Sequence, residues 1–185
     1  MPRIADKGLD QRILNAAQRL WRSKGDRGLT LRAIAREAST TTTTVYKRFR
    51  NKEEIQSALA ARVRSSMDEA VMGASTVEEC YRRYLQYARN HPREYKLLYG
   101  PAWVHIMGKD RKRPAKEWLQ KLLADRFGGK AGDYEAFFYF VFLLTHGAAG
   151  LISVAPEARE TREAEENCIA LCDLALKRMD IFRQR

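Results

Sequence analysis

The sequence predicts an all-α protein of about nine helices, in which a three-helix amino-terminal domain (residues 1–55) precedes a larger helical domain (residues 56–185). Apolar residues recur at spacings of three and four along most of the chain, and the alternation typical of strands is absent. Helix-start signals precede these periodic segments, and glycine or proline stands where the periodicity breaks. With 185 residues, 45% of them hydrophobic, the chain can bury a substantial core.

The first three predicted helices are short and closely spaced. Gly25 and Gly28 end the first helix, and Thr30 is a suitable N-cap for the second. A third helix follows a hydroxyl-rich run and is expected to pack Val45 and Phe49 inward. Residues at helical spacing form the inner faces of the first two helices: Ile13, Leu14, Ala17, Leu20 and Trp21, then Leu31, Ile34, Ala35 and Ala38.

Capping pairs and prolines mark the later helices. Asn51 with Glu54, and Thr76 with Glu79, each place an N-cap three residues before a glutamate. Residues 102–113 mix apolar side chains with a charged loop and are left unassigned. We expect helices from Lys52 to near Gly73, from Val77, from Pro92, over Pro114–Phe127, from a cap at Asp133 to about Val154, and over Arg159–Met179.

The formal net charge of +11 is unevenly distributed along the chain. Residues 1–65 hold 15 Lys and Arg against 6 Asp and Glu, whereas residues 66–185 hold 19 against 17. A surface that binds phosphates requires such a local excess of positive charge. A charge that serves only solubility is the alternative. The coincidence of the excess with the motif described next favours the phosphate-binding interpretation.

Residues 30–49 have the pattern of a helix-turn-helix. A short helix and a tight turn lead into a second short helix that carries threonine hydroxyls, Tyr46 and Lys47. The low-complexity run Thr40–Thr44 could also be a plain linker. The periodic helices on both sides and the Tyr46-Lys47 pair weigh against that interpretation.

Residues from about Arg12 to Ile55 resemble the DNA-binding domain of the TetR family of bacterial transcriptional regulators. The motifs are Ile13-Leu14-x-Ala16-Ala17-x-x-Leu20-Trp21, Gly25, Thr30-Leu31-x-x-Ile34-Ala35, Ala38 and Thr44-Val45-Tyr46-x-x-Phe49-x-x-Lys52. They cover about a quarter of the chain, and the remainder is similar to the family in architecture only. The family commonly has glycine where this chain has Ser39. A serine with positive φ would be strained, so we expect a different local geometry for this turn.

The resemblance implies a set of DNA-contacting residues. Short hydroxyl side chains at the start of a recognition helix suit the major groove, and the start of a helix favours anions. Tyr46 and Lys52 are similar to the family's phosphate contacts. The complete set is Thr30, Arg32, Thr41, Thr42, Thr43, Thr44, Tyr46, Lys47 and Lys52.

The segment Ala136–Val154 has nineteen residues without a formal charge, which approaches the length of a membrane span. A helix that is apolar on all sides is equally expected where it is buried between a core and a second subunit. Thr145, His146 and Ser153 disfavour insertion, and the small residues 147–150 would let another helix approach closely. We therefore predict a homodimer formed through the last two helices, and no membrane partner.

A small-molecule site is expected inside the second domain, because aromatic and isolated polar residues from separate helices converge on its apolar segments. Each of these residues taken alone also fits core packing, and His146 fits a hydrogen-bonded core histidine. The candidate ligand-binding residues are Tyr84, Tyr95, Tyr99, Trp103, His105, Met107, Trp118, Phe137, Phe138, Val141 and His146.

Several other classes of protein are disfavoured. The sequence has no Gly-rich phosphate loop, no metal-ligand cluster and no nucleophile with a recognisable base, so we expect no enzyme, no cofactor and no metal. Cys80, Cys168 and Cys172 lack paired ligand spacing and fit packing in a reducing cytoplasm, although a redox role for the last two stays open. No secretion signal is evident in Met1–Arg12.

Together these features predict a cytoplasmic, ligand-responsive transcription factor. We expect a repressor that binds a pseudo-palindromic double-stranded DNA operator as a dimer and is released by a small-molecule effector. The alternative is an architectural DNA-binding protein that responds to no ligand.

Overall fold

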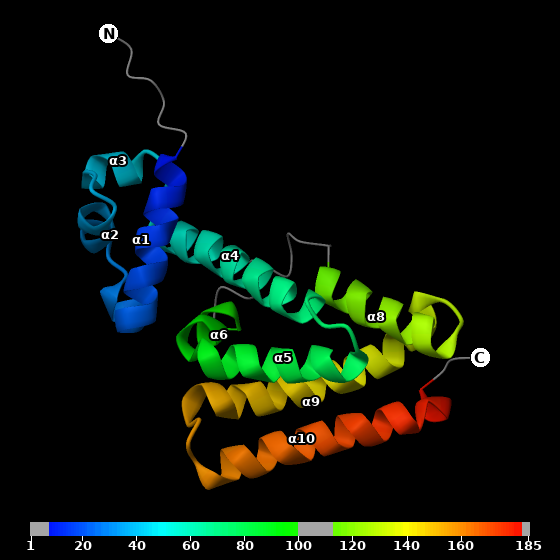
Figure 1. The fold of residues 1–185 in the computed structure, drawn as a ribbon. Coiled ribbons are helices and arrows are strands. Elements are labelled where there is room, and N and C mark those ends of the chain that lie inside the picture. Colours follow the sequence, from blue (N-terminus) through cyan, green and yellow to red (C-terminus); the bar gives the residue numbers. More distant parts are fainter. Residues whose placement is uncertain (1–7, 100–112, 183–185) are drawn as a thin grey trace. The chain divides into compact units, whose positions relative to one another are not determined.

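The computed structural model describes residues 8–99 and 113–182, and its regular structure there is entirely helical (Figure 1). These residues fall into two compact units, one of residues 8–63 with 97–99 and the other of residues 64–96 with 113–182. The all-α prediction is confirmed. The α-helices are α1 (Leu9–Lys24), α2 (Leu31–Glu37), α3 (Thr42–Tyr46), α4 (Lys52–Met72), α5 (Val77–Asn90), α6 (Pro92–Leu98), α8 (Pro114–Phe127), α9 (Glu135–Val154) and α10 (Arg159–Lys177). Short 3-10 helices cover Gly25–Gly28, Ala131–Tyr134 and Met179–Ile181.

The first unit is built around the apolar face of α1. That face packs against α2, and α2 packs against α3. Leu14 and Leu31, which we expected on the inner faces, are only half-buried. The side chain of Thr30 caps α2, because its hydroxyl accepts a hydrogen bond from the Ala33 amide at 3.2 Å. Buried residues of α1 to α3 are Leu9, Ile13, Ala16, Ala17, Leu20, Trp21, Ile34, Ala35 and Val45.

The turn between α2 and α3 keeps a left-handed residue despite its serine. Ser39 has φ +52°, so the prediction of a different turn geometry is wrong. The Thr40 amide donates to the Ala35 carbonyl at 2.9 Å, and the Ser39 amide donates to the Arg36 carbonyl at 3.2 Å. These two bonds form a Schellman motif, which ends a helix with one left-handed residue. The hydrogen bonds therefore hold Ser39 where glycine would be unstrained.

Two matching caps start α4 and α5. The Glu54 amide donates to Asn51 Oδ1 at 2.9 Å, and the Glu79 amide donates to Thr76 Oγ1 at 3.2 Å. In both cases the glutamate reaches one residue before the cap, accepting from the Arg50 amide at 2.6 Å and the Ser75 amide at 2.7 Å. The predicted starts of α4 and α5 are confirmed.

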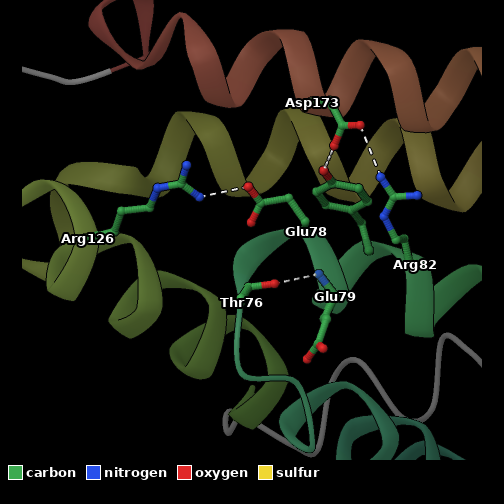
Figure 2. A network of polar contacts seen from close by, with 7 residues as sticks. Thr76, Glu78, Glu79, Arg82, Arg126 and Asp173 are labelled. Carbon is green, nitrogen blue, oxygen red and sulfur yellow. Dashed lines mark hydrogen bonds and ion pairs between the residues drawn. The ribbon is translucent and has the colours of Figure 1, made fainter.

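In the second unit α9 packs against both α5 and α10, and α8 packs against α5 and α9 (Figure 1). Polar bonds at the start of α5 join it to its neighbours (Figure 2). Glu78 accepts from Arg126 of α8 at 2.8 Å, while Tyr81 and Arg82 both donate to Asp173 of α10. Burial and the bond to Asp173 raise the pKa of Tyr81, so its hydroxyl remains a donor at neutral pH.

The start of α9 differs from the prediction. Asp133 caps the preceding 3-10 helix, where its carboxylate accepts from the Lys130 amide at 2.8 Å, and α9 itself starts at Glu135 without a side-chain cap. Among the described residues, the segment 131–154 is long and apolar enough to cross a membrane, and 39% of its most apolar window is buried. One such helix is a weak indication of a membrane span, because the core helix of a soluble protein has the same properties.

Candidate functional site

The α3 helix of the first unit is short and has two different faces. Thr41 caps it, because its hydroxyl accepts from the Thr44 amide at 3.1 Å and lies 2.8 Å from the Thr44 hydroxyl. Val45 and Phe49 are buried at 0% and 8% exposure, as predicted. Five helical residues cannot hold a helix on their own, so the cap and these two apolar contacts fix α3 in place.

The opposite face of α3 is available to a partner. Tyr46 is 56% exposed, and Thr42, Thr43 and Lys47 are also exposed. Hydroxyls, a phenol and an ammonium on one short helix can contact phosphate oxygens and base edges. Thr41 and Thr44 form hydrogen bonds with each other in the cap. The polar groups that this face offers to a partner therefore come mainly from Thr42, Thr43, Tyr46 and Lys47.

Thr30 and Arg32 of α2 are both exposed at the start of that helix. Lys52, which was predicted to contact phosphate, is paired with a residue of the chain itself. Its ammonium lies 2.8 Å from the Asp26 carboxylate and donates to the Asp26 carbonyl at 3.2 Å. Gln56 also donates to Asp26, at 2.7 Å. A partner would have to compete with Asp26 for Lys52, and no local sequence signal predicts a bond across 26 residues.

Three of the residues predicted to bind a ligand meet in the second unit. The hydroxyls of Tyr84 (α5) and Tyr95 (α6) lie 3.3 Å apart, and Tyr95 Oη lies 2.6 Å from His146 Nδ1 of α9. Tyr95 also donates to the His146 carbonyl at 3.3 Å. Burial lowers the pKa of His146, so its imidazole is neutral at pH 7. The result is one chain of neutral polar groups across three helices.

A row of flat rings continues along α9 from His146. Phe142 stacks on His146 with ring centroids 5.6 Å apart and 10° between planes, and Phe138 stacks on Phe142 at 5.7 Å and 11°. The ammonium of Lys116 lies 5.2 Å from the centroid of Phe138. Phe142 is absent from the predicted ligand-binding set, although the sequence places it four residues after Phe138 and four before His146, on the same face of a helix.

The other predicted ligand-binding residues do not join this group among the described contacts. Trp118 donates to the Ala74 carbonyl at 3.0 Å, and Phe137 packs edge-on against Phe182 at 5.5 Å. Val141 is buried and Tyr99 is half-buried. Trp103, His105 and Met107 lie outside the described residues. A surface depression of about 340 Å³ has a different lining: Ser75, Thr76, Val77, Leu122, Asp125 and Arg126.

Helices α9 and α10 expose apolar side chains on their outer faces. Leu143 is 65% exposed and Leu174 is 56% exposed. A methyl group added to the Cα atom of Gly147 or of Gly150 would meet no atom of the described residues within 4 Å beyond its chain neighbours and the backbone of α9 itself, so α9 is open to a close neighbour there. The exposed large apolar residues of this surface are Tyr139, Leu143, Leu151, Val154, Leu171 and Leu174.

Comparison with known proteins identifies both the motif and the fold. Residues 13–59 match the family model of bacterial regulatory proteins, tetR family. A TetR-family transcriptional regulator from Streptomyces coelicolor is 25% identical with a TM-score of 0.60, and the match covers 91% of this chain and 97% of that one. Comparison with curated protein sequences finds no match.

Two further solved structures share the fold at lower identity. A TetR-like transcriptional regulator from Rhodococcus sp. RHA1 is 18% identical with a TM-score of 0.62, over 96% of this chain and 99% of that one. A single-residue variant of TetR from Acinetobacter baumannii AYE, in complex with minocycline, is 15% identical with a TM-score of 0.66, over 94% and 97%. Residues 13–59 of this chain therefore match the model of the tetR family of bacterial regulatory proteins, and the chain has the fold of solved TetR-family transcriptional regulators.

Proposed function

We propose that this chain is a ligand-responsive transcriptional repressor that binds a pseudo-palindromic operator as a homodimer in the cytoplasm. The observation that carries the proposal is the exposed face of α3, with Tyr46 and Lys47, inside the segment that matches the tetR family. In a twofold dimer two such helices would enter successive major grooves. Residues 1–55 would be the DNA-binding domain, and residues 56–185 the effector-binding and dimerisation domain.

The outer face of α9 and α10 supports dimerisation. Leu143, Leu151 and Leu174 are exposed apolar side chains, and their contact with water is unfavourable. Packing this surface against the same surface of a second chain would give a four-helix bundle with an isologous interface. The open backbone at Gly147 and Gly150 would allow the two copies of α9 to approach closely.

The cluster of Tyr84, Tyr95 and His146 supports an effector site in the second domain. An effector that binds one arrangement of the dimer more tightly shifts the population towards it. If that arrangement spaces the two α3 helices incorrectly, operator affinity falls by the ratio of the two effector affinities. The solved TetR variant in complex with minocycline is a structural neighbour in which a ligand is bound.

An architectural DNA-binding protein is the alternative, and it would bind many sequences with similar affinity and respond to no ligand. An enzyme is disfavoured, because the structural neighbours are transcriptional regulators. Specific release from one operator by a small molecule separates the regulator from the architectural protein.

The test is operator binding by full-length Tyr46→Ala and Lys47→Ala variants, using DNA selected by the wild-type protein. Loss of the Lys47 charge should weaken binding to all sequences and lower the salt slope by about two, one for each subunit of the dimer. Lys177→Ala, an exposed lysine of α10, is the matched control and should bind as the wild type does. Unchanged protection of the same site by the Tyr46 and Lys47 double variant would refute the role of α3.

A further inference from the structure

We infer that this chain reads a thymine in each operator half-site, through contact between the methyl group of Thr43 and the C5-methyl group of that thymine. This inference rests on the proposed function, because it names the base chemistry that the exposed face of α3 recognises. Three features of the described residues lead to it: the place of Thr43 on α3, the types of side chain that α3 lacks, and the stiffness of threonine.

Thr43 lies on the side of α3 that is turned away from the core of the first unit. Val45 is buried at 0% exposure, and two residues along a helix turn it by about 200°, so Thr43 and Lys47 both lie opposite Val45. Both are exposed, and because they are four residues apart their side chains are neighbours on one face. The cap of α3 is formed by Thr41 and Thr44 instead, which leaves the Thr43 side chain available to a partner.

The segment around α3 has few side chains that distinguish one base pair from another. Residues 40–47 contain no Asn, Gln, Asp, Glu or Arg, which together with lysine form the specific hydrogen-bond pairs with base edges. A threonine hydroxyl both donates and accepts, so it suits every base edge and discriminates little. The C5-methyl group of thymine is the apolar group of the major groove, and a threonine methyl group can pack against it. Methyl contact is therefore the sequence-specific interaction that Thr43 offers.

The two cations that follow α3 do not select thymine. The ammonium group of Lys47 carries three donors and no acceptor, so it suits the O6 and N7 acceptors of guanine. Arg48 has a partner within the chain, because its Nε atom lies 3.5 Å from the Asp10 carboxylate. Selection of thymine is therefore left to methyl groups on α3.

The third feature is the branched shape of threonine. Branching at Cβ restricts χ1 in a helix, so the methyl group of Thr43 has few positions and loses little entropy when a base contacts it. The Thr41 cap and the buried Val45 fix the backbone of α3 around Thr43. A methyl group held in this way packs against the thymine methyl group, and the contact removes apolar surface of both from water.

The experiment uses the full-length protein and the operator that it selects from random DNA, with affinity measured by fluorescence anisotropy. Each thymine of a half-site is replaced in turn by deoxyuridine, which keeps every hydrogen-bonding group and lacks only the methyl group. Replacement of the thymine that Thr43 reads should weaken binding about fourfold, and replacement in both half-sites about sixteenfold, as expected for one buried methyl group per half-site. Deoxyuridine outside the half-sites is the DNA control and should leave the affinity unchanged.

Variants of Thr43 then locate the contact on the protein. Thr43→Ser keeps the hydroxyl and removes the methyl group, so it should reduce the penalty of the doubly substituted operator to about threefold or less. Thr43→Val keeps a methyl group and removes the hydroxyl, so it should retain the penalty. Thr76→Ser is the matched control, because it removes a methyl group from the threonine that caps α5 in the second unit and should leave the penalty unchanged.

The outcomes distinguish this inference from the proposed function. The inference is wrong if the selected half-site contains no thymine, if no deoxyuridine position weakens binding, or if Thr43→Ser keeps the full penalty. Loss of the penalty in Thr42→Ser instead would assign the contact to the neighbouring residue and overturn the role of Thr43.

Each of these results leaves the proposed function intact, because the protein still binds the operator that it selected. Selection of no sequence by the wild type overturns the proposed function and the inference with it. If a Thr43 variant does not fold, the comparison of thymine with deoxyuridine on the wild type remains decisive.

Discussion

Among the residues that the structure describes, Ser39 is the one non-glycine residue with a positive φ. Its φ of +52° lies in the left-handed region, where a non-glycine residue costs about 1–3 kcal/mol. The bonds of Thr40 and Ser39 to the last turn of α2 hold it there. The serine therefore lowers the stability of the first unit relative to glycine, and it places a hydroxyl at the surface between α2 and α3.

The first prediction follows from this strain. Ser39→Gly should raise the free energy of unfolding by about 1 kcal/mol, because relief of the left-handed strain exceeds the extra entropy of glycine in the unfolded chain. Chemical denaturation measures it. Ser66→Gly, in the interior of α4, is the control and should lower stability by about 0.5–1 kcal/mol. A destabilised Ser39→Gly variant would show that the serine side chain, and not the backbone, decides this turn.

The second prediction concerns His146. Burial lowers its pKa below the ordinary value of 6.5, so the unfolded chain binds a proton more readily than the folded protein. The contribution of the neutral His146 to the free energy of unfolding is complete above about pH 6.5, the pKa in the unfolded chain. It is lost as the pH falls through the lower pKa that His146 has in the folded protein. His146→Gln should therefore reduce the loss of stability between pH 7 and pH 5.5, as measured by thermal melting at several pH values. An identical pH profile in the variant would mean that His146 titrates equally in both states.

At the scale of the element, α3 depends on its surroundings more than on its own sequence. A five-residue helix that contains three threonines has a low intrinsic tendency to form. The Thr41 cap and buried Val45 and Phe49 compensate for this. Any loss of the cap should therefore affect both the stability of the first unit and the position of Tyr46.

The third prediction tests that dependence. Thr41→Ala should lower the free energy of unfolding by about 1 kcal/mol and also weaken DNA binding, because the Thr44 amide loses its acceptor. Thr41→Ser keeps the acceptor and should retain most of the stability. Denaturation and DNA titration measure the two effects. Equal stability of the alanine and serine variants would show that the cap contributes nothing to α3.

Elements were more predictable from the sequence than contacts were. Pro114 and Gly128 bound α8 where expected, and Thr30, Asn51 and Thr76 cap the helices that they were predicted to cap. These signals are local, so they can be read from neighbouring residues. The start of α9 was misplaced, because Asp133 lies inside the 3-10 helix Ala131–Tyr134, where its carboxylate accepts from the amide of the N-cap residue Lys130 and does not cap α9.

The candidate site was only partly predictable, for a physical reason. The contact of Tyr95 with His146 joins residues 51 apart, and the pair of Lys52 with Asp26 joins residues 26 apart. Their formation depends on how helices pack, which a list of residue types does not determine. The aromatic prediction therefore included Trp118 and Phe137, which have other partners, and missed Phe142.

At the scale of the whole molecule, the apolar outer face of α9 and α10 leads to the fourth prediction. Light scattering at micromolar concentration should report about 43 kDa, twice the 21.3 kDa of one chain. Leu143→Glu and Leu174→Glu should each shift the protein towards the monomer, because each would bury an unpaired carboxylate at the interface. Met72→Glu, at an exposed apolar residue of α4, is the control and should remain dimeric. A monodisperse wild-type monomer would refute the dimer.

The central claim is that two copies of α3 read DNA together, and selection of binding sites from a random DNA library tests it most directly. The full-length protein should enrich two inverted half-sites whose centres lie about 10 base pairs, one helical turn, apart. The variant with both Tyr46→Ala and Lys47→Ala should enrich no such sequence. Enrichment of no sequence by the wild type, or of the same inverted repeat by the double variant, would contradict the account.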